Sequence, residues 1–154
     1  MTKITNDIAT SDYGITFQHE KMQSGELRFR LISEDGSSYI RTVNAKHGVW
    51  QNSHHHQSIK ETYVIQKGWV AVANLIDGVL SLEMANTGDT FTVQPYIVHN
   101  LYLSADSVIH TIKHGASASN DWFGNCDLDK ATKHLSEQDI KQIITSFQTS
   151  PKHN

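Results

Sequence analysis

The sequence predicts an all-β domain that is followed by one C-terminal helix. From position 26 onward, short segments of alternating apolar and polar residues recur at intervals of roughly ten residues. In one of them Leu27, Phe29 and Leu31 alternate with two arginines, a period of two that is typical of a strand with one buried face. Turn residues separate the segments, and no helical period interrupts them before residue 135. These observations favour an antiparallel sandwich or a closed barrel.

Most strands can be placed from this pattern. Residues 1–25 are polar without a sustained period, so we expect a loosely ordered arm with one short strand at 14–17. The segment 69–76 is apolar on both faces, as in a strand buried between two layers, and Asp77-Gly78 after it is a tight-hairpin signal. The remaining expected strands cover residues 26–31, 38–43, 48–56, 61–66, 80–84, 90–93, 98–103 and 108–113.

The C-terminal part, from residue 115 onward, lacks the alternating pattern of the strands. Residues 115–134 have loop composition and are expected to form a lid or a strap that holds the helix after them. That helix is expected at 135–148, with Ser136 as its N-cap, packed on the outside of the β domain at 26–114. Its apolar residues fall at helical spacing, at Ile140, Ile143, Ile144 and Phe147.

Composition excludes several classes of function. The net charge is −3, with 13 basic and 16 acidic residues, which disfavours electrostatic binding to nucleic acid. No stretch approaches the ~20 apolar residues of a membrane span, and residues 1–14 lack the apolar core of a signal peptide. The single cysteine, Cys126, suits a reducing compartment. We therefore expect a cytoplasmic protein without nucleic-acid or membrane partners.

Histidine is unusually frequent, with 10 residues, and three of them are consecutive. In a strand, residues two apart project to the same face, so His54 and His56 point together and His55 points away. Glu61 begins the next expected strand, and His99 lies in a strand further along the chain. Imidazoles combined with a carboxylate suit divalent first-row metals, so these residues are candidate ligands of one metal ion.

The spacing of these residues resembles the first motif of the cupin family, G-x5-H-x-H-x(3,4)-E-x6-G. Gly48, His54, His56, Glu61 and Gly68 match every defined position.

The second cupin motif, G-x5-P-x-G-x2-H-x3-N, is matched only in part. Gly88 and His99 have the right separation, whereas Gln94, Tyr96 and Leu103 replace the family's Pro, Gly and Asn. The departures lie at turn and packing positions and leave the histidine in place. The resemblance covers about residues 40–113.

The resemblance implies a double-stranded β-helix, the cupin jelly-roll barrel, that binds one divalent transition metal. Iron, manganese, nickel, cobalt, copper and zinc all fit mixed nitrogen and oxygen ligands. It further implies a small-molecule substrate and, as a candidate assembly, a homodimer. The implied ligands are His54, His56, Glu61 and His99.

Two residues are candidates for acid–base chemistry. Tyr63 shares a strand face with Glu61 and should line the cavity near the metal, unless it is a core tyrosine with its hydroxyl satisfied. In residues 108–114, His110 lies on one face and Lys113 on the other, and either face fits an inward orientation. His110 suits proton transfer near neutral pH, whereas Lys113 would suit a phosphate or a carboxylate.

Three functions fit this set of residues. The first is a metal-dependent isomerase or epimerase acting on a small sugar-like or carbonyl substrate. The second is a non-haem metal-dependent dioxygenase with the same ligands. The third is a non-catalytic small-molecule binding domain. An open metal site beside acid–base candidates favours an enzyme over a binder, although the fold alone does not decide between them.

Overall fold

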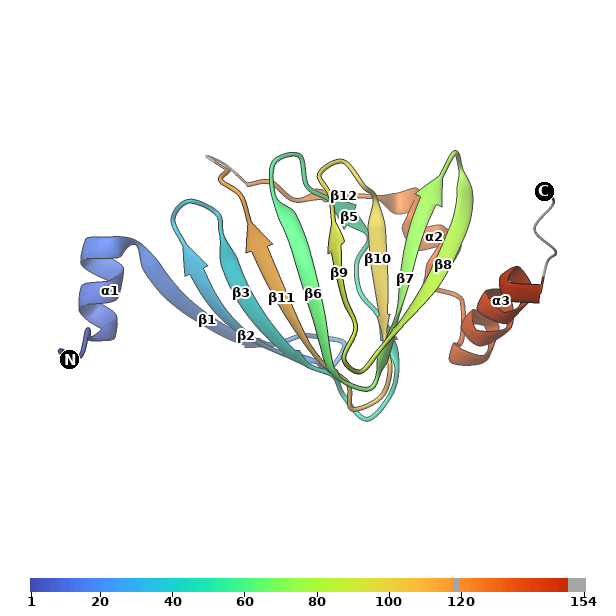
Figure 1. Ribbon diagram of the computed structural model, residues 1–154, viewed down its shortest axis with the longest axis horizontal. Coiled ribbons are helices and arrows are strands. Elements are labelled where there is room, and N and C mark those ends of the chain that lie inside the picture. The colour runs from blue at the N-terminus through green and yellow to red at the C-terminus, as the bar shows by residue number, and fades with distance from the viewer. Residues whose placement is uncertain (118–119, 150–154) are drawn as a thin grey trace.

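Two antiparallel β-sheets face each other and form the body of the protein (Figure 1). The structure is a computed structural model that describes residues 1–117 and 120–149. The first sheet has the order β1 (Ile15–Lys21), β2 (Leu27–Ser33), β3 (Ser38–Val43), β11 (Val108–His114), β6 (Lys60–Lys67) and β9 (Thr90–Val93). The second sheet has the order β12 (Phe123–Gly124), β5 (His54–His55), β10 (His99–Leu103), β7 (Trp69–Ile76) and β8 (Val79–Asn86), with β4 (Val49–Trp50) paired to β10.

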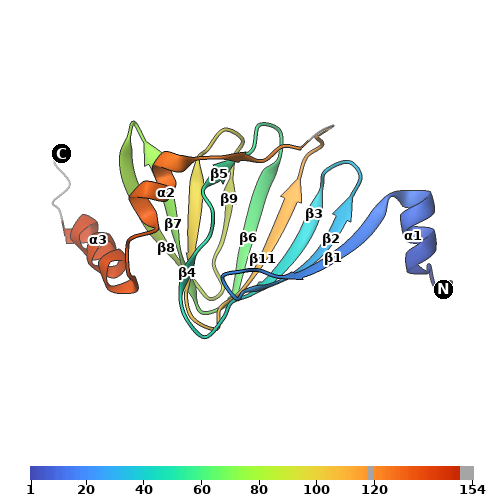
Figure 2. The same cartoon turned by 180° about the vertical axis from the view of Figure 1, so that it is seen from behind.

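Strand β7 has two buried faces, as its apolar sequence predicts. Val70 and Val72 point into the core between the two sheets, and Ala71 and Ala73 point to the opposite side. There they meet a second core that is closed by two helices, α2 (Cys126–Thr132) and α3 (Glu137–Thr149). Figure 2 shows both helices on the side of the second sheet. The all-β fold with a helix packed outside is therefore confirmed.

Helix α3 begins with the cap that the sequence predicts. The hydroxyl of Ser136 accepts a hydrogen bond from the backbone N–H of Asp139, whose carboxylate accepts one from the backbone N–H of Ser136. Ile140 and Ile144 are buried, while the side chain of Phe147 lies outside the described residues. None of the helices in the described part of the chain has the length and apolar composition to cross a membrane.

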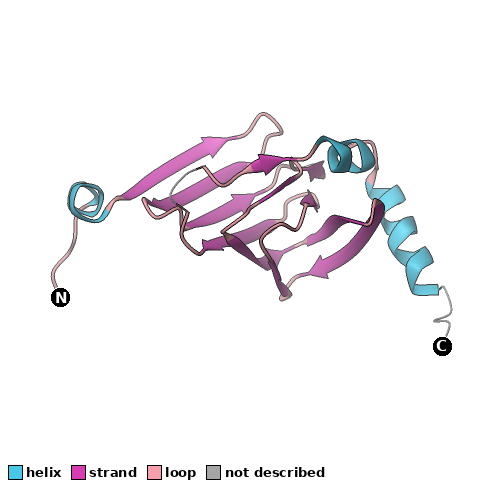
Figure 3. Cartoon of the chain, turned by 90° about the horizontal axis from the view of Figure 1, so that it is seen from above, coloured by secondary structure: helices cyan, strands magenta, loops and turns pink. Residues whose placement is uncertain are grey.

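The N-terminal segment is more regular than its sequence predicts. A helix, α1 (Asn6–Tyr13), is capped by Thr5 and closed by Gly14 at a φ of +60°. Strand β1 then pairs along all of its length with β2. Its side chains beyond Ile15 are exposed on both faces, so no period of two develops in the sequence. Figure 3 shows α1 beyond the edge of the sheet, at the end opposite α3.

Residues 115–134 also contain regular structure where the sequence predicts a loop. Strand β12 pairs with β5, and Asn125 caps helix α2 by accepting a hydrogen bond from the backbone N–H of Leu128. The helix has seven residues and buries only Leu128 and Thr132. So short an element shows too little of a helical period to be recognised in the sequence.

Gly68 of the first motif occupies a position where any side chain would be strained and crowded. Its φ is +79°, and an added Cβ would lie 2.7 Å from Oγ of Ser104 and 2.9 Å from Cβ of Ser107. That Oγ accepts a hydrogen bond from the backbone N–H of Trp69, so it cannot move without losing this bond. The glycine thus keeps the turn between β6 and β7 packed against the loop after β10.

We expect Gly68→Ala to lower the free energy of unfolding by about 2–4 kcal/mol, the sum of left-handed strain and overpacking. Gly78→Ala is the matched control, because Gly78 has nearly the same φ, +76°, and nothing within 4 Å of an added Cβ. It should lose only the strain, about 1–2 kcal/mol. Urea unfolding measures both values, and equal losses would contradict the steric part of the argument.

Candidate metal centre

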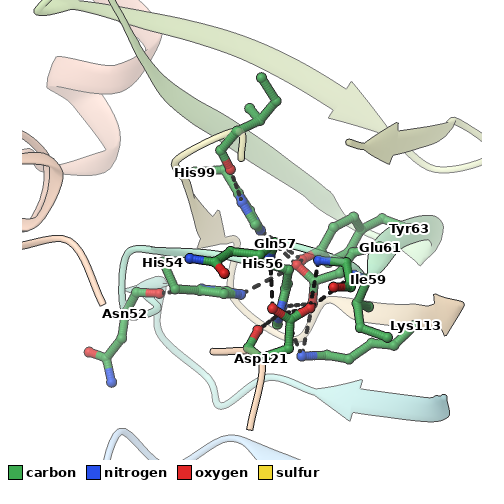
Figure 4. A network of polar contacts seen from close by, with 12 residues as sticks. Asn52, His54, His56, Gln57, Ile59, Glu61, Tyr63, His99, Lys113 and Asp121 are labelled. Atoms are coloured by element: carbon green, nitrogen blue, oxygen red, sulfur yellow. Dashed lines mark hydrogen bonds and ion pairs between the residues drawn. The ribbon is translucent and has the colours of Figure 1, made fainter. Parts of the chain in front are cut away.

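Three predicted ligands from both sheets converge at one end of the space between the sheets. Nε2 of His54 on β5 and Nε2 of His99 on β10 lie 3.3 Å and 2.9 Å from Oε2 of Glu61 on β6. One ligating atom of each residue lies within 4.8 Å of the other two. Glu61 and His99 are 2% and 1% exposed. Figure 4 shows the imidazole rings directed toward this carboxylate.

Backbone carbonyl groups orient the histidines. Nδ1 of His54 contacts the carbonyl oxygen of Asn52 at 3.0 Å, and Nδ1 of His99 contacts that of Ile97 at 3.0 Å. Nδ1 of His56 contacts the carbonyl oxygen of Asp121. A carbonyl only accepts, so each Nδ1 carries the proton and, in a neutral ring, each Nε2 has a free lone pair. This is the arrangement that metal-binding histidines adopt.

The charges of the cluster fit a cation. Burial lowers the pKa of His54, which keeps this ring neutral at neutral pH. Burial on its own raises the pKa of Glu61, but its contacts with the surrounding imidazoles and the positive charge of Lys113 outweigh burial and hold that pKa well below its usual range. Nε2 of His54 is buried and has no hydrogen-bond partner among the described residues. Neutral imidazole lone pairs that face a carboxylate repel it unless a cation lies between them.

His56 lies beside this group of three. Its Nε2 is 3.3 Å from Oε1 of Glu61, on the other side of the carboxylate from His54 and His99. The ammonium group of Lys113 lies 3.2 Å from the same Nε2 and 3.1 Å from Oε1 of Glu61. The structure thus brings the three predicted histidine ligands to the carboxylate of the fourth, Glu61, and His54, Glu61 and His99 are within reach of a single ion.

His55 points away from the cluster. Its ring stacks on Phe123 of β12, with the ring centroids 5.3 Å apart, whereas His54 stacks on Trp122. The opposite orientations of neighbouring histidines follow from strand alternation.

Tyr63 reaches the cluster, as the alternation along β6 predicts. Its hydroxyl lies 3.0 Å from Oε2 of Glu61 and 3.2 Å from Nε2 of His99, and its side chain is buried. Burial and the adjacent negative charge of Glu61 raise its pKa well above the usual value. The hydroxyl therefore keeps its proton at neutral pH and acts as a donor.

His110, predicted as an acid–base residue, is not brought to the cluster. It lies on the outer face of the first sheet, where its ring contacts the hydroxyl of Tyr39 at 2.8 Å and the side chain of Gln66 at 2.7 Å. The inner face of β11 instead presents Thr111 and Lys113, which lie opposite Tyr63 and Glu61 on β6. The register of β11 thus replaces His110 with Lys113 at the site.

A cavity of about 230 Å³ opens next to the ligands. Sequence reasoning did not assign three residues near it: Arg28, Arg30 and Asp121. The alternation in β2 sets the two arginines on the face opposite Leu27 and Leu31, but only the sheet order shows that this face lines the cavity. Asp121 lies in a segment without a sequence signal.

Tyr96 adopts the conformation of the glycine that it replaces in the second motif. Its φ is +66°, in the left-handed region that favours glycine. Its backbone N–H donates a hydrogen bond to the carbonyl oxygen of His56 at 2.6 Å. The turn before β10 is therefore retained despite the substitution, and His99 keeps its place.

Solved structures with the same fold were found, although no protein-family model and no curated protein sequence matches the chain. KdgF from Halomonas sp. aligns with a TM-score of 0.53 and 16% identity over 65% of this chain and 87% of its own. A double-stranded β-helix domain protein from Klebsiella pneumoniae aligns with a TM-score of 0.53 and 18% identity, over 68% and 88%. Oxalate decarboxylase from Bacillus subtilis aligns with a TM-score of 0.57 and 14% identity over 91% of this chain, which spans 35% of that enzyme.

These likenesses agree with the two facing antiparallel sheets. The protein has the double-stranded β-helix fold of the cupins.

Proposed function

We propose that the protein is a metal-dependent enzyme that isomerises or epimerises a small polar substrate, either sugar-like or with a carbonyl group. The observation that carries this proposal is the convergence of imidazole Nε2 atoms on the carboxylate of Glu61, next to a cavity of about 230 Å³. This volume is below the ~300–1,000 Å³ of drug-sized sites, so a small molecule fits it.

One divalent transition metal would be held by His54, Glu61 and His99. His56 would join as the fourth ligand if its Nε2 exchanged its contact with Lys113 for the ion. When bound, such an ion supplies Lewis-acid polarisation of an oxygen of the substrate. The metal centres named for the oxalate decarboxylase of Bacillus subtilis are Mn(II), which supports a first-row ion here. Iron, nickel, cobalt, copper and zinc have the same kinds of ligand.

Side chains of the protein would carry out the proton transfer. Tyr63 keeps its proton on the hydroxyl oxygen, beside Glu61 and at the wall of the cavity, where it is placed to donate to a substrate oxygen. Lys113 offers a second donor from the neighbouring strand. His54 and Trp122 close the other side and limit the access of water.

The second candidate function is a non-haem iron dioxygenase. Two histidines and one carboxylate within reach of a single ion are the facial ligand set of many non-haem Fe(II) oxygenases. The two proposals differ in whether O₂ is consumed.

The experiment that separates them uses protein that has been stripped with a chelator and reloaded with Mn²⁺, Fe²⁺, Co²⁺, Ni²⁺, Cu²⁺ or Zn²⁺ in turn. Each form is incubated in D₂O with small aldoses, ketoses and hydroxy acids, while an oxygen electrode and proton NMR record the reaction. Metal-dependent incorporation of deuterium next to a carbonyl without O₂ uptake is expected. Metal-dependent O₂ uptake would support the dioxygenase. Recovery of every added sugar and hydroxy acid without chemical change, whichever metal is loaded, would support a binding domain.

A further inference from the structure

We propose that the cavity next to the metal ligands binds an oxyanion of the substrate, a carboxylate or a phosphate, with Arg30 as its main contact. This inference rests on the proposed function, because the cavity is where the substrate would lie. It narrows the substrate class from small polar molecules to small anionic ones.

Three cationic side chains line this cavity, and all are largely withdrawn from water. The side chains of Arg28, Arg30 and Lys113 are 24%, 14% and 20% exposed. Cations in such surroundings attract an anion more strongly than they would at an open surface, because the local dielectric constant is lower. Binding of a neutral sugar would not require three cationic side chains in the wall of the cavity.

The sheet order brings these charges together from distant parts of the sequence. Arg30 lies in one row across the sheet with Ile40 on β3, Thr111 on β11 and Tyr63 on β6. With strands about 4.8 Å apart, the backbones of β2 and β6 are about 14 Å apart. A small ligand can therefore contact the metal side with one end and Arg30 with the other.

The two arginines differ in their availability. Arg28 donates from both Nε and Nη2 to Oε1 of Glu26, a carboxylate that is only 1% exposed, so Arg28 is committed to a buried ion pair. Arg30 is paired from Nη1 to Glu20, whose side chain is 42% exposed and screened by water. A guanidinium has several N–H donors in a planar fork, so Arg30 retains donors for a bidentate oxyanion.

The charge of the metal side favours an anion as well. A divalent ion among neutral imidazoles and one carboxylate keeps a net positive charge. The ammonium group of Lys113 lies at this end of the cavity, within 3.2 Å of both Glu61 and His56. An oxyanion would thus lie between Arg30 and a positively charged metal end.

Calorimetric titration of the Mn²⁺-loaded protein tests the inference. D-glucuronate, D-glucose 6-phosphate and D-glucose share a ring and differ in the group at carbon 6. We expect one or both anions to bind at least 10-fold more tightly than glucose, and the preferred anion distinguishes a carboxylate from a phosphate site. Arg30→Gln should lower that affinity at least 10-fold, and Arg30→Lys should lower it less, since the charge remains without the fork.

Arg41→Gln is the matched control. Arg41 lies on the outer face of the same sheet, opposite His110 in the register, and its loss should leave anion binding unchanged. Circular dichroism and elemental analysis verify that each variant is folded and holds its metal. Equal affinities for glucuronate, glucose 6-phosphate and glucose in a fully metal-loaded protein would overturn the anion site, as would an Arg30→Gln variant that binds like wild type. A wild-type protein that takes up no metal would defeat the proposed function instead, while Arg30-dependent binding of anions to the metal-free protein would still support the anion site.

Discussion

His54→Ala is expected to weaken the binding of Mn²⁺ or Zn²⁺ by more than about 100-fold. Loss of a residue that only orients a ligand typically costs 10–100-fold, and His54 supplies a ligand atom itself. Its Nε2 lies 3.3 Å from Oε2 of Glu61, is buried, and has no hydrogen-bond partner among the described residues. Competition between the stripped protein and a fluorescent chelator measures the affinity.

His55→Ala is the control for this variant, because both substitutions remove an imidazole that stacks on an aromatic ring. His55 points away from Glu61, so its metal affinity should stay within about 2-fold of wild type. Similar losses of affinity in the two variants would show that β5 has the opposite register and would remove His54 from the ligand set.

Asp121→Ala is expected to lower the free energy of unfolding by about 2–4 kcal/mol. The carboxylate of Asp121 accepts hydrogen bonds from the backbone N–H groups of Gln57, Ser58 and Ile59 at 2.8, 2.9 and 2.9 Å. Burial raises its pKa, but these three donors outweigh burial and leave the pKa below its usual value. Hydrogen bonds to charged groups contribute about 1.5–3 kcal/mol each, and water replaces part of this at the two exposed donors.

The same substitution should also loosen the metal site, since the segment held by Asp121 starts directly after His56. Urea unfolding measures the stability, and chelator competition measures the metal affinity. Asp127→Ala serves as the control, because the side chain of Asp127 is 83% exposed and forms an exposed ion pair with Lys130 in the next turn of α2. A free energy of unfolding of Asp121→Ala within about 0.5 kcal/mol of wild type would mean that water satisfies the three N–H groups as well as the carboxylate does.

Strands with one buried and one exposed face could be predicted from the sequence, because burial imposes the period of two that the residues display. In β6 the alternation of Glu61, Tyr63 and Ile65 with less buried neighbours is an example. Only the beginning of strand β1 could be predicted, as the short strand expected at 14–17, since β1 pairs at the edge of the sheet with both faces exposed. Backbone hydrogen bonds hold such a strand in the sheet without requiring an alternation of apolar and polar side chains.

The residues of the site also fall into some that the sequence predicts and others that it does not. The convergence of the candidate ligands His54, Glu61 and His99 could be predicted because the spacing of each motif sets their strand faces directly. The inward orientation of Lys113 could not, since both faces of β11 carry titratable groups and only pairing with β6 selects one. Arg30 and Asp121 depend on contacts with residues 10 and more than 60 positions away, which local patterns do not encode.

The paired N-terminal strand has a consequence for anyone who wishes to trim the protein to a minimal unit. Composition suggests a cut near residue 25, at the start of the recognisable β pattern. Such a cut would delete Glu20, the residue that positions the guanidinium of Arg30, and would expose the edge of β2 to solvent. A shortened version that keeps β1 and starts near residue 15 would retain the wall of the cavity, and one without β1 would keep the metal ligands but lose an ordered Arg30.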